Sequence, residues 1–423
     1  MTGSGLTFRR LTAADEPALL DAWLVSVQRG FHDRRPSEET RTMWHEHIAA
    51  DAAVLTGAWL DRPSFGAERH PVATFASFDK TINTGAGTLP LHMITDVTVA
   101  PTHRRQGLLR RLMTDDLTDA AARGLPLAAL TVSEGSIYGR FGFGMATFTR
   151  KVEVDTTARF RLRDEEAARA AGTTVLVEPA DAWPAITTVY DAFQARTRGS
   201  VERPRFYEDT LTGRYNPADG GPDHLLRVAV HLDVSGRPDG YVAYRPESEE
   251  VTGRHRVRIR DLVATGPAPY FALWRYLADI DLIEQAVWHR APSEDPLPHA
   301  LVEPFAVKST LDDLLWVRVL DVPTALEARP WGAEDSLVIA VEDPLGHAEG
   351  HWELTTSGGA KVVRTEAAPD LRMAADTLGA LYLGGVAVGT LAAAGRIRGA
   401  AEVVQRFAAM ADPGPAPYCI TGF

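Results

Sequence analysis

The fold is decided by one stretch of the sequence, Val97-Thr98-Val99-Ala100-Pro101-Thr102-His103-Arg104-Arg105-Gln106-Gly107-Leu108-Leu109-Arg110-Arg111. The apolar alternation before Pro101 is typical of a strand, and the apolar residues from Leu108 onward recur with the period of a helix. A strand that turns into a helix presents free backbone N–H groups at the helix head, where the helix dipole also favours negative charge. Gly107 lets an anion approach the backbone because it has no Cβ, and Arg104 and Arg105 add positive charge. The stretch predicts a site for a phosphate-bearing ligand; the alternative is an arginine-rich surface helix that begins at an ordinary turn glycine.

The residues around this stretch alternate between helical and strand patterns. The predicted helices are Ala13–Gln28, Glu38–Ala49, Arg105–Ala122 and a short one through Tyr138, and the predicted strands are Ala53–Leu60, Val72–Ile82, Leu89–Val99, Leu127–Val132 and Thr147–Val154. Such alternation is typical of a mixed α/β layer structure.

The second third of the chain resembles a degenerate copy of the first. Ile94-Thr95-Asp96-Val97 has a counterpart in Ile259-Arg260-Asp261-Leu262, and in both copies a strand runs into a helix. The residues that replace Arg104, Arg105 and Gly107 in the second copy are Pro269, Tyr270 and Ala272. If the repeat is not a chance similarity, the second copy kept the scaffold and lost the anion site.

The last third, from about Val307, shows a run of strands followed by a run of helices, which is typical of an α+β domain. The predicted strands are Leu314–Asp321, Ser336–Val341, Gly350–Thr355 and Ala360–Arg364, and the predicted helices are Ala374–Leu383, Val386–Ala393 and Ala400–Met410. Leu378 to Gly395 carries no charge, but its five glycines and many alanines favour two short buried helices over a membrane span.

Composition and charge exclude several classes of protein. The 423 residues are 45% hydrophobic and 24% charged, which is typical of a globular protein of two or three domains. The net charge of −12 argues against a nucleic-acid partner, which needs a basic surface. The single cysteine, Cys419, cannot form an internal disulfide, and the N-terminus has no apolar signal core, so we expect a cytoplasmic protein.

The strand-turn-helix stretch resembles the GCN5-related N-acetyltransferases (GNATs), whose pattern is Q/R-x-x-G-x-G/A after a strand with V-x-V. Arg104-Arg105-Gln106-Gly107-Leu108 fits that pattern, and Leu109 departs from it. Together with Ser133-Glu134-Gly135-Ser136-Ile137-Tyr138-Gly139-Arg140-Phe141-Gly142-Phe143-Gly144 and the aromatic C-terminus, the stretch resembles the Eis (enhanced intracellular survival) acetyltransferases. The resemblance implies a catalytic GNAT domain (1–150), a degenerate GNAT-like domain (151–305) and a sterol-carrier-protein-like α+β domain (306–423). It also implies a homo-hexamer.

The resemblance implies that acetyl-CoA is the co-substrate. In such enzymes a strand edge bonds the acetyl and pantetheine groups, backbone amides at the helix head hold the pyrophosphate, and the next strand lines the pantetheine arm. The residues of this chain at those positions are Val97, Thr98, Val99, Arg104, Arg105, Gln106, Gly107, Leu108, Leu109, Arg110, Ser133 and Glu134.

Acetyl transfer to an amine requires a base for the amine, a donor for the oxyanion and an acid for the departing thiolate. Tyr138 is the candidate acid, and its alternative role is that of a core tyrosine packed with Phe141 and Phe143. The resemblance implies that the Val99 amide is the oxyanion donor and that the terminal carboxylate of Phe423 is the base. The apolar C-terminus favours a docked tail, which could equally serve only a domain contact, and Glu134 is a second candidate base.

The resemblance places acceptor binding at Phe31, Asp33 and Trp44, where a carboxylate between aromatic rings suits a polyamine. The alternative for this segment is a surface loop with a half-buried Trp44. We expect no metal site, because the histidines form no ligand cluster. The sequence therefore predicts an acetyl-CoA-dependent N-acetyltransferase for primary amines of small polycations, such as aminoglycosides, or of lysine. The alternative is a non-catalytic acyl-CoA- or lipid-binding protein.

Overall fold

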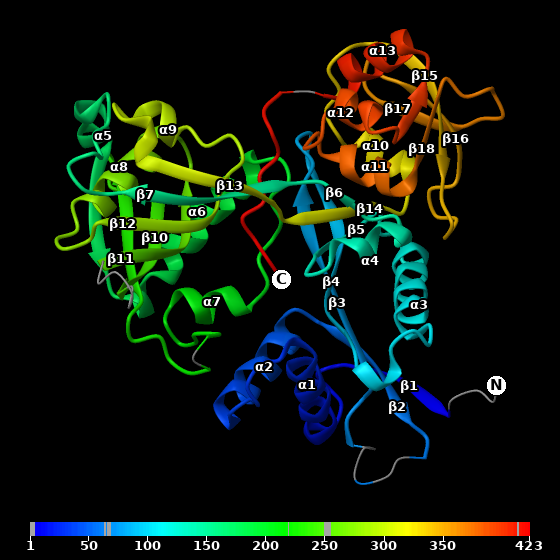
Figure 1. Ribbon diagram of the computed structural model, residues 1–423, viewed down its shortest axis with the longest axis horizontal. Helices are drawn as coiled ribbons and strands as arrows, with labels where there is room; N and C mark the ends of the chain where they lie inside the picture. Colours follow the sequence, from blue (N-terminus) through cyan, green and yellow to red (C-terminus); the bar gives the residue numbers. More distant parts are fainter. Residues whose placement is uncertain (1–4, 63–64, 66–68, 219, 249–254, 413) are drawn as a thin grey trace.

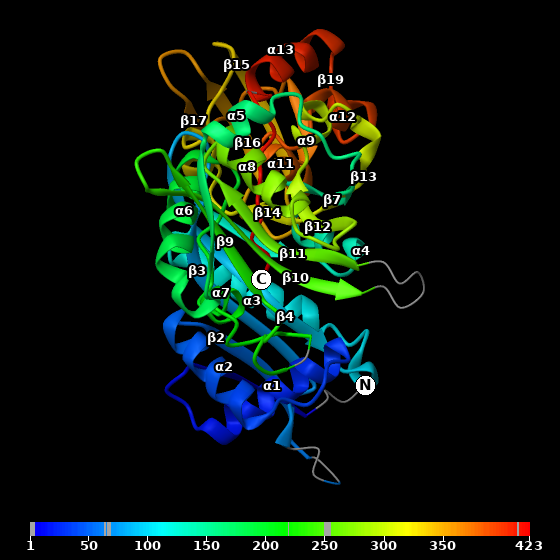
Figure 2. The same cartoon turned by 90° about the vertical axis from the view of Figure 1, so that its left-hand side faces the viewer.

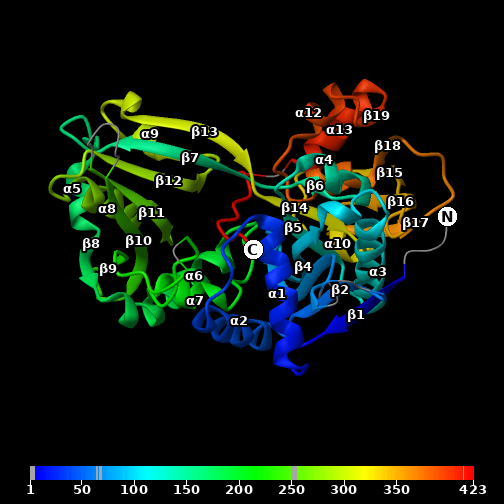
Figure 3. The same ribbon diagram turned by 60° about the horizontal axis from the view of Figure 1, so that its bottom comes forward.

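Three β-sheets organise the chain into three lobes, which Figure 1 shows in blue to cyan, green to yellow, and orange to red. The computed structural model describes residues 5–62, 65, 69–218, 220–248, 255–412 and 414–423. The C-terminal segment leaves the third lobe and ends between the other two, as the views in Figures 1 and 3 agree.

The first lobe contains a seven-stranded sheet in the order β1-β2-β3-β4-β5-β14-β6. Its strands are β1 (Leu6–Leu11), β2 (Val54–Leu60), β3 (Ala73–Asn83), β4 (Thr88–Val99), β5 (Leu127–Thr131), β14 (Leu315–Val319) and β6 (Gly144–Met145). Its helices are α1 (Pro17–Phe31), α2 (Glu38–Ala50), α3 (Leu108–Ala122) and α4 (Gly135–Tyr138), with 3-10 turns at Pro101–His103 and Gly139–Phe141.

The second lobe repeats this arrangement, with the strand order β8-β9-β10-β11-β12-β7-β13. Its strands are β8 (Gly172–Val177), β9 (Arg227–Asp233), β10 (Pro238–Ser248), β11 (His255–Ala264), β12 (Gln285–Pro292), β7 (Phe148–Asp155) and β13 (Val307–Asp313). Its helices are α5 (Glu165–Ala170), α6 (Trp183–Arg196), α7 (Phe206–Leu211), α8 (Pro267–Ala278) and α9 (Leu297–Ala300). In each sheet a parallel pair is joined through a helix, β4–β5 through α3 and β11–β12 through α8, which confirms the predicted duplication.

The first two sheets exchange strands. The predicted strand Thr147–Val154 (β7) lies beside β12 in the second sheet and does not close the first one. The predicted strand Leu314–Asp321 (β14) lies beside β5 in the first sheet and not in the C-terminal domain. Sequence patterns do not show this exchange, because pairing partners are chosen through space and not along the chain. Domain limits near 150 and 305 stay a prediction, with the strands on either side belonging to the neighbouring sheets.

The third lobe contains a five-stranded sheet in the order β17-β16-β15-β18-β19. Its strands are β15 (Ser336–Glu342), β16 (Gly350–Thr355), β17 (Lys361–Arg364), β18 (Leu371–Ala374) and β19 (Ile397–Gly399), and its helices are α10 (Val322–Glu327), α11 (Ala375–Tyr382), α12 (Val388–Ala393) and α13 (Ala401–Ala411). The uncharged stretch forms α11 and α12 as predicted, and α11 is buried while α12 is partly exposed. No helix of the described residues is long and apolar enough to cross a membrane.

The third lobe is docked on the first through glycines. A Cβ on Gly379 of α11 would lie 2.1 Å from the Val317 carbonyl oxygen, and one on Gly144 would lie 2.0 Å from the Asp376 carbonyl oxygen. Only a residue without a side chain allows such approach of helix and strand backbones. As a result, one continuous apolar core joins the first sheet to the third lobe, from Trp23 to Cys419.

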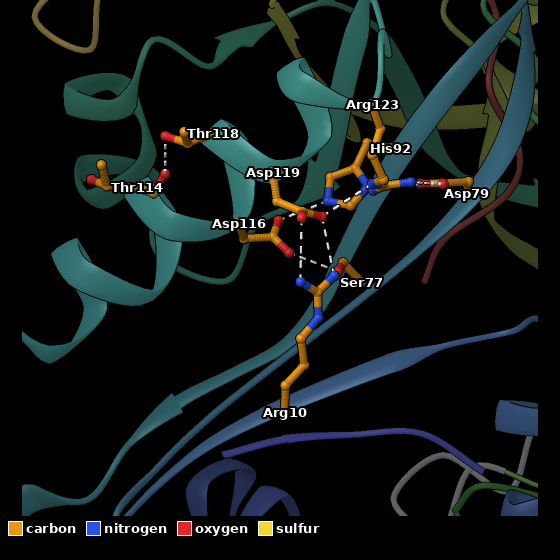
Figure 4. Close-up of polar contacts among 9 residues, drawn as sticks. All are labelled: Arg10, Ser77, Asp79, His92, Thr114, Asp116, Thr118, Asp119 and Arg123. Carbon is orange, nitrogen blue, oxygen red and sulfur yellow. Dashed lines mark hydrogen bonds and ion pairs between the residues drawn. The ribbon is translucent and has the colours of Figure 1, made fainter. Parts of the chain in front are cut away.

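A buried charge cluster fixes α3 on β3 and β4 (Figure 4). The two ring nitrogens of His92 lie 2.8 Å from the Asp79 carboxylate and 2.7 Å from the Asp116 carboxylate. Ser77 donates a hydrogen bond to Asp116, and Arg123 forms an ion pair with Asp79. Carboxylates at both ring nitrogens favour an imidazole that carries both protons, although the Arg123 guanidinium also lies 3.3 Å from Nδ1. Burial opposes this charge, but the hydrogen bonds and charges of Asp116 and Asp79 outweigh it and raise the pKa of His92 to about 9.

His92→Gln is expected to lower the melting temperature most at or below pH 6.5. A histidine whose pKa rises on folding contributes stability below its unfolded pKa and loses that contribution as the pH rises through its folded pKa, here about 9. A shift from 6.5 to about 9 corresponds to at most about 3 kcal/mol. Thermal melting from pH 6 to 10 measures the difference, with the exposed His224→Gln as the control. A wild-type advantage that stays constant over this range would contradict the assignment.

Candidate active site

The head of α3 is open to ligands. Gly107 is its N-cap, in the left-handed conformation (φ 81°), and no side chain caps the helix. Arg105 is also left-handed (φ 63°), so the helix begins at Leu108 and not at Arg105 as predicted. A Cβ on Gly107 would meet nothing within 4 Å, so glycine is required here by the backbone conformation, with free space in front of it. The first amide of the helix that bonds to the turn is that of Arg111, to the Gly107 carbonyl, which leaves the preceding amides for an anion.

The basic residues of the turn surround this opening. Arg104, Arg105, Gln106 and Arg110 are exposed, Leu109 is half-buried, and Leu108 is buried against the sheet. Positive charge at a helix head is unfavourable unless an anion is bound, because it faces the positive end of the helix dipole. The predicted phosphate-binding residues therefore lie together in an arrangement that fits a diphosphate.

Strands β4 and β5 separate just below this opening. Their parallel pairing extends from Leu91 and Leu127 to Ile94 and Leu130, and β4 continues to Val99 without β5 beside it. On its other edge β4 pairs with β3, with a register shift where Asp96 and Val97 together lie opposite Phe75. Such a bulge bends a strand and re-aims its side chains. From Thr95 to Val99, the backbone of β4 on the side of β5 has no strand partner in the described part of the chain and can bind a ligand.

The opening between β4 and β5 beyond Ile94 and Leu130 is called the wedge below, and Thr98 has a structural role in it. Its hydroxyl lies 2.6 Å from that of Thr74, and the Thr74 hydroxyl also donates to the Asp96 carbonyl oxygen at 2.8 Å. A Cβ on Gly30 of α1 would lie 2.5 Å from the Thr98 methyl group. These contacts hold the bulge against β3 and α1.

A cavity of about 190 Å³ lies between the separated strands. Its lining residues are Phe31, Ile94, Thr95, Asp96, Val97, Leu130, Thr131, Val132, Ser133, Tyr138 and Phe423. Five residues predicted from distant segments of the sequence thus lie together: Phe31, Val97, Ser133, Tyr138 and Phe423.

Tyr138 reaches the cavity from α4 and is 8% exposed. Its ring packs edge-on against Phe143, with the centroids 6.4 Å apart, so it is at once a core residue and a cavity residue. Burial, with the nearby charge of Glu134, raises the pKa of the phenol. The phenol therefore stays protonated at neutral pH and can donate a proton. Glu134 is exposed and does not line the cavity.

The C-terminal tail is docked, as its apolar sequence predicted. The second lobe holds it through the Arg290 guanidinium, which donates to the Ile420 carbonyl at 2.8 Å, and the Tyr207 hydroxyl, which donates to the Gly422 carbonyl at 3.2 Å. The first lobe holds its end: Thr131 donates to a terminal oxygen of Phe423 at 2.6 Å, and the Phe423 ring packs against Phe78. The tail therefore places Phe423 at the cavity that contains Tyr138.

Asp96 is a cavity residue that the sequence analysis did not propose. It has a left-handed backbone (φ 53°) at the bulge, and burial raises the pKa of its carboxyl to about 6. Its counterpart Asp261 is instead bound by Arg203 at 2.6 Å. The signal was present in the repeat, where an aspartate lies near the end of the strand in both copies, but the sequence does not show that only Asp261 is paired with an arginine.

The predicted acceptor residues are not brought together. Phe31 is 44% exposed and lines the cavity. Trp44 is half-buried, stacked on Trp23 with ring centroids 5.9 Å apart, and is not a lining residue. Asp33 is exposed beside the end of α1 and lies close enough to Tyr215 to raise the pKa of that phenol, together with burial.

The equivalent helix head of the second lobe offers few donors to an anion. Helix α8 follows its N-cap Gly266 without a side-chain cap, but it begins at Pro267, and neither Pro267 nor Pro269 has an N–H. The counterparts of Arg104 and Arg105, Pro269 and Tyr270, are buried, and the Tyr270 hydroxyl donates to Asp295 at 2.8 Å. The second copy thus keeps the fold without the arginines and most of the amide donors of the first helix head.

Comparison with known proteins agrees with this geometry. Residues 7–146 and 199–319 each match an acetyltransferase (GNAT) domain family, and residues 322–420 match a sterol carrier protein domain family. An uncharacterized N-acetyltransferase of Streptomyces griseus is 37% identical over 385 residues, which are 88% of this chain and 90% of that protein. N-acetyltransferase Eis of Mycobacterium tuberculosis is 35% identical over 367 residues, which are 85% and 86% of the two chains.

A solved structure shows the same architecture. Eis1 from Mycobacterium abscessus superimposes with a TM-score of 0.81 at 27% identity, over 99% of this chain and 100% of that one. The fold of two GNAT domains and a sterol-carrier-like domain is therefore established. With the open helix head, the wedge and the cavity in place, the chain belongs to the Eis family of N-acetyltransferases.

Proposed function

We propose that this N-acetyltransferase moves the acetyl group of acetyl-CoA to a primary amine, either of a small polycationic molecule of the aminoglycoside type or of a lysine side chain. One observation carries the proposal: the open head of α3 leads into a cavity lined by Tyr138 and by the chain terminus Phe423. A diphosphate at the helix head and a thioester between β4 and β5 would place the reacting carbonyl in that cavity.

The residues at the helix head would bind the pyrophosphate through the free amides from Arg105 to Arg110, with the Arg104 and Arg105 side chains adding charge. The β4 edge at Val97, Thr98 and Val99 would bond the pantetheine arm in the manner of an added strand. Ser133 lies at the opposite wall of the cavity, after β5.

The transfer itself needs two proton movements. As the amine nitrogen bonds to the thioester carbon and the C–S bond breaks, Tyr138 would give its phenolic proton to the leaving sulfur. The carboxylate of Phe423 would accept the proton that the amine loses, directly or through water, with Asp96 as a second carboxyl in the same cavity. The backbone N–H of Val99, on the free edge of β4, would donate to the developing oxyanion.

Three further properties are proposed with this function. The enzyme is expected to assemble as a homo-hexamer, to act in the cytoplasm and to bind no nucleic acid. The net charge of −12 supports the last of these. Sedimentation at micromolar concentration tests the assembly.

Tyr138→Phe is expected to lower kcat at least about 100-fold, because the general acid is lost, while the Kd of acetyl-CoA stays unchanged. A thiol-release assay and calorimetry measure the two quantities. Tyr276→Phe, which removes a hydroxyl that bonds to Tyr244 in the second lobe, is the control and should keep full activity. Unchanged turnover of Tyr138→Phe would remove this tyrosine from the mechanism, and wild-type protein that binds the cofactor without turnover would favour a binding protein.

Adding one alanine after Phe423 is expected to lower kcat about 100-fold without changing the melting temperature by more than a few degrees. The added residue moves the terminal charge away from Thr131 and from Tyr138, although the docked segment before it is kept. One alanine added at the N-terminus is the matched control. Full activity of the extended chain would show that the tail has only a structural part.

A further inference from the structure

A second cavity, of about 470 Å³, lies on the other side of the chain terminus. Its wall is built by α7 and the loop after it, by β11 and β12, and by the tail, and Phe423 lines both this cavity and the one beside Tyr138. Figures 1 and 3 show the terminus between the lobes, with α7 close to it. An acceptor that presents its amine to the terminal carboxylate can therefore extend into this second cavity.

Arginines dominate the second cavity. Arg258, Arg260 and Arg290 line it. Arg258 is ion-paired with Glu247 at 2.6 Å. Among the residues that the structure describes, no carboxylate lies within ion-pair distance of Arg260, which donates to Asn216 at 3.1 Å, or of Arg290, which donates to the Ile420 carbonyl. Burial and the charges of Arg245 and Arg258 lower the pKa of Arg260, although Asp223 and Glu247 act in the opposite direction.

The two aspartates of this cavity are already paired. Asp261 accepts from Arg203 and from the Tyr241 hydroxyl, both at 2.6 Å. Asp223 is ion-paired with Arg245 at 3.1 Å. His289 adds no positive charge at neutral pH, because burial and the neighbouring Arg258 lower its pKa. Away from the chain terminus, Arg260 and Arg290 are therefore the charged side chains of this wall that have no ion-pair partner among the described residues.

The Arg290 guanidinium, from β12, packs against the end of the tail. A Cβ on Gly422 would lie 2.3 Å from an Arg290 guanidinium nitrogen, so the glycine is what lets the guanidinium lie against the backbone just before the terminal residue. Its other contacts hold the tail and do not neutralise it.

The acidic groups lie at the cavity beside Tyr138, which Asp96 and the terminal residue Phe423 line. Asp96 and the terminal carboxylate favour an ammonium group at the reaction centre, while Arg260 and Arg290 favour an anion in the second cavity. The electrostatic potential along a bound acceptor is therefore expected to change from negative beside Tyr138 to positive beside Arg260.

We infer that the acceptor is an amine that also carries an anionic group, a carboxylate or a phosphate, which Arg260 and Arg290 bind in the second cavity. This inference rests on the proposed acetyl transfer and narrows its two acceptor classes, polycations and lysine, to amines that also carry an anionic group. A polycation would instead bring a second ammonium group to Arg260 and Arg290, which have no ion-pair partner in the part of the chain that the structure describes.

Matched acceptors test this in the wild-type enzyme. Nα-acetyl-lysine carries the amine and a carboxylate, its carboxamide carries the amine alone, an ω-aminoalkyl phosphate carries the amine and a phosphate, and spermidine is a polycation. We expect KM of at least one of the two anionic acceptors to be at least about 10-fold lower than that of the carboxamide and of spermidine at 0.1 M salt. Which anionic acceptor is preferred distinguishes carboxylate from phosphate.

Arg260→Gln is expected to raise KM of the preferred anionic acceptor about 10-fold and to leave KM of the carboxamide and of acetyl-CoA unchanged. Arg256→Gln is the control, because Arg256 lies on the same strand, is paired with Glu247 and does not line the cavity. Equal KM values for all acceptors, or the lowest value for spermidine, would overturn the inference while leaving acetyl transfer established. Failure to acetylate any amine with acetyl-CoA bound would overturn the proposed function itself.

Discussion

The parallel strands β4 and β5 are hydrogen-bonded to one another only as far as Ile94 and Leu130, and the wedge beyond that point determines where everything else at the site lies. The bulge at Asp96 and Val97 bends β4 away from β5, and α3 begins after the turn that follows β4. A helix head without a side-chain cap thus faces the mouth of the wedge, and the cavity inside it receives Tyr138 from one wall. The charge cluster around His92 holds α3 and the β3–β4 pair in this relation.

The second and third lobes contribute contacts that hold the walls of the wedge in place. Strand β14, which comes after the whole second lobe in sequence, lies next to β5, and α11 of the third lobe packs on β14 through Gly379. The tail then returns from the third lobe, is bound by the second through Arg290 and Tyr207, and ends at Thr131 of the first. Groups of all three lobes therefore act together to place Phe423 at the cavity, which gives a physical reason for the degenerate second copy to persist.

The parts of this structure that are formed by residues close together in the sequence could be predicted from the sequence. The open helix head around Gly107, the repeat around Asp96 and Asp261, and the docked apolar tail were all predicted from neighbouring residues. The strand exchange was not, because β7 and β14 look like ordinary strands and their partners are set through space. The same limit applies to charge: Arg260 and Asp261 are adjacent in sequence, but only the fold shows that Asp261 is neutralised by Arg203 while Arg260 has no such partner among the described residues.

A crystal structure of the enzyme with coenzyme A tests the central claim most directly. The account predicts the diphosphate at the amides before Arg111, the pantetheine arm along β4 from Val97 to Val99, and the sulfur within reach of the Tyr138 hydroxyl and the Phe423 carboxylate. Coenzyme A bound in the second lobe, or bound elsewhere with the head of α3 left to solvent, would contradict it.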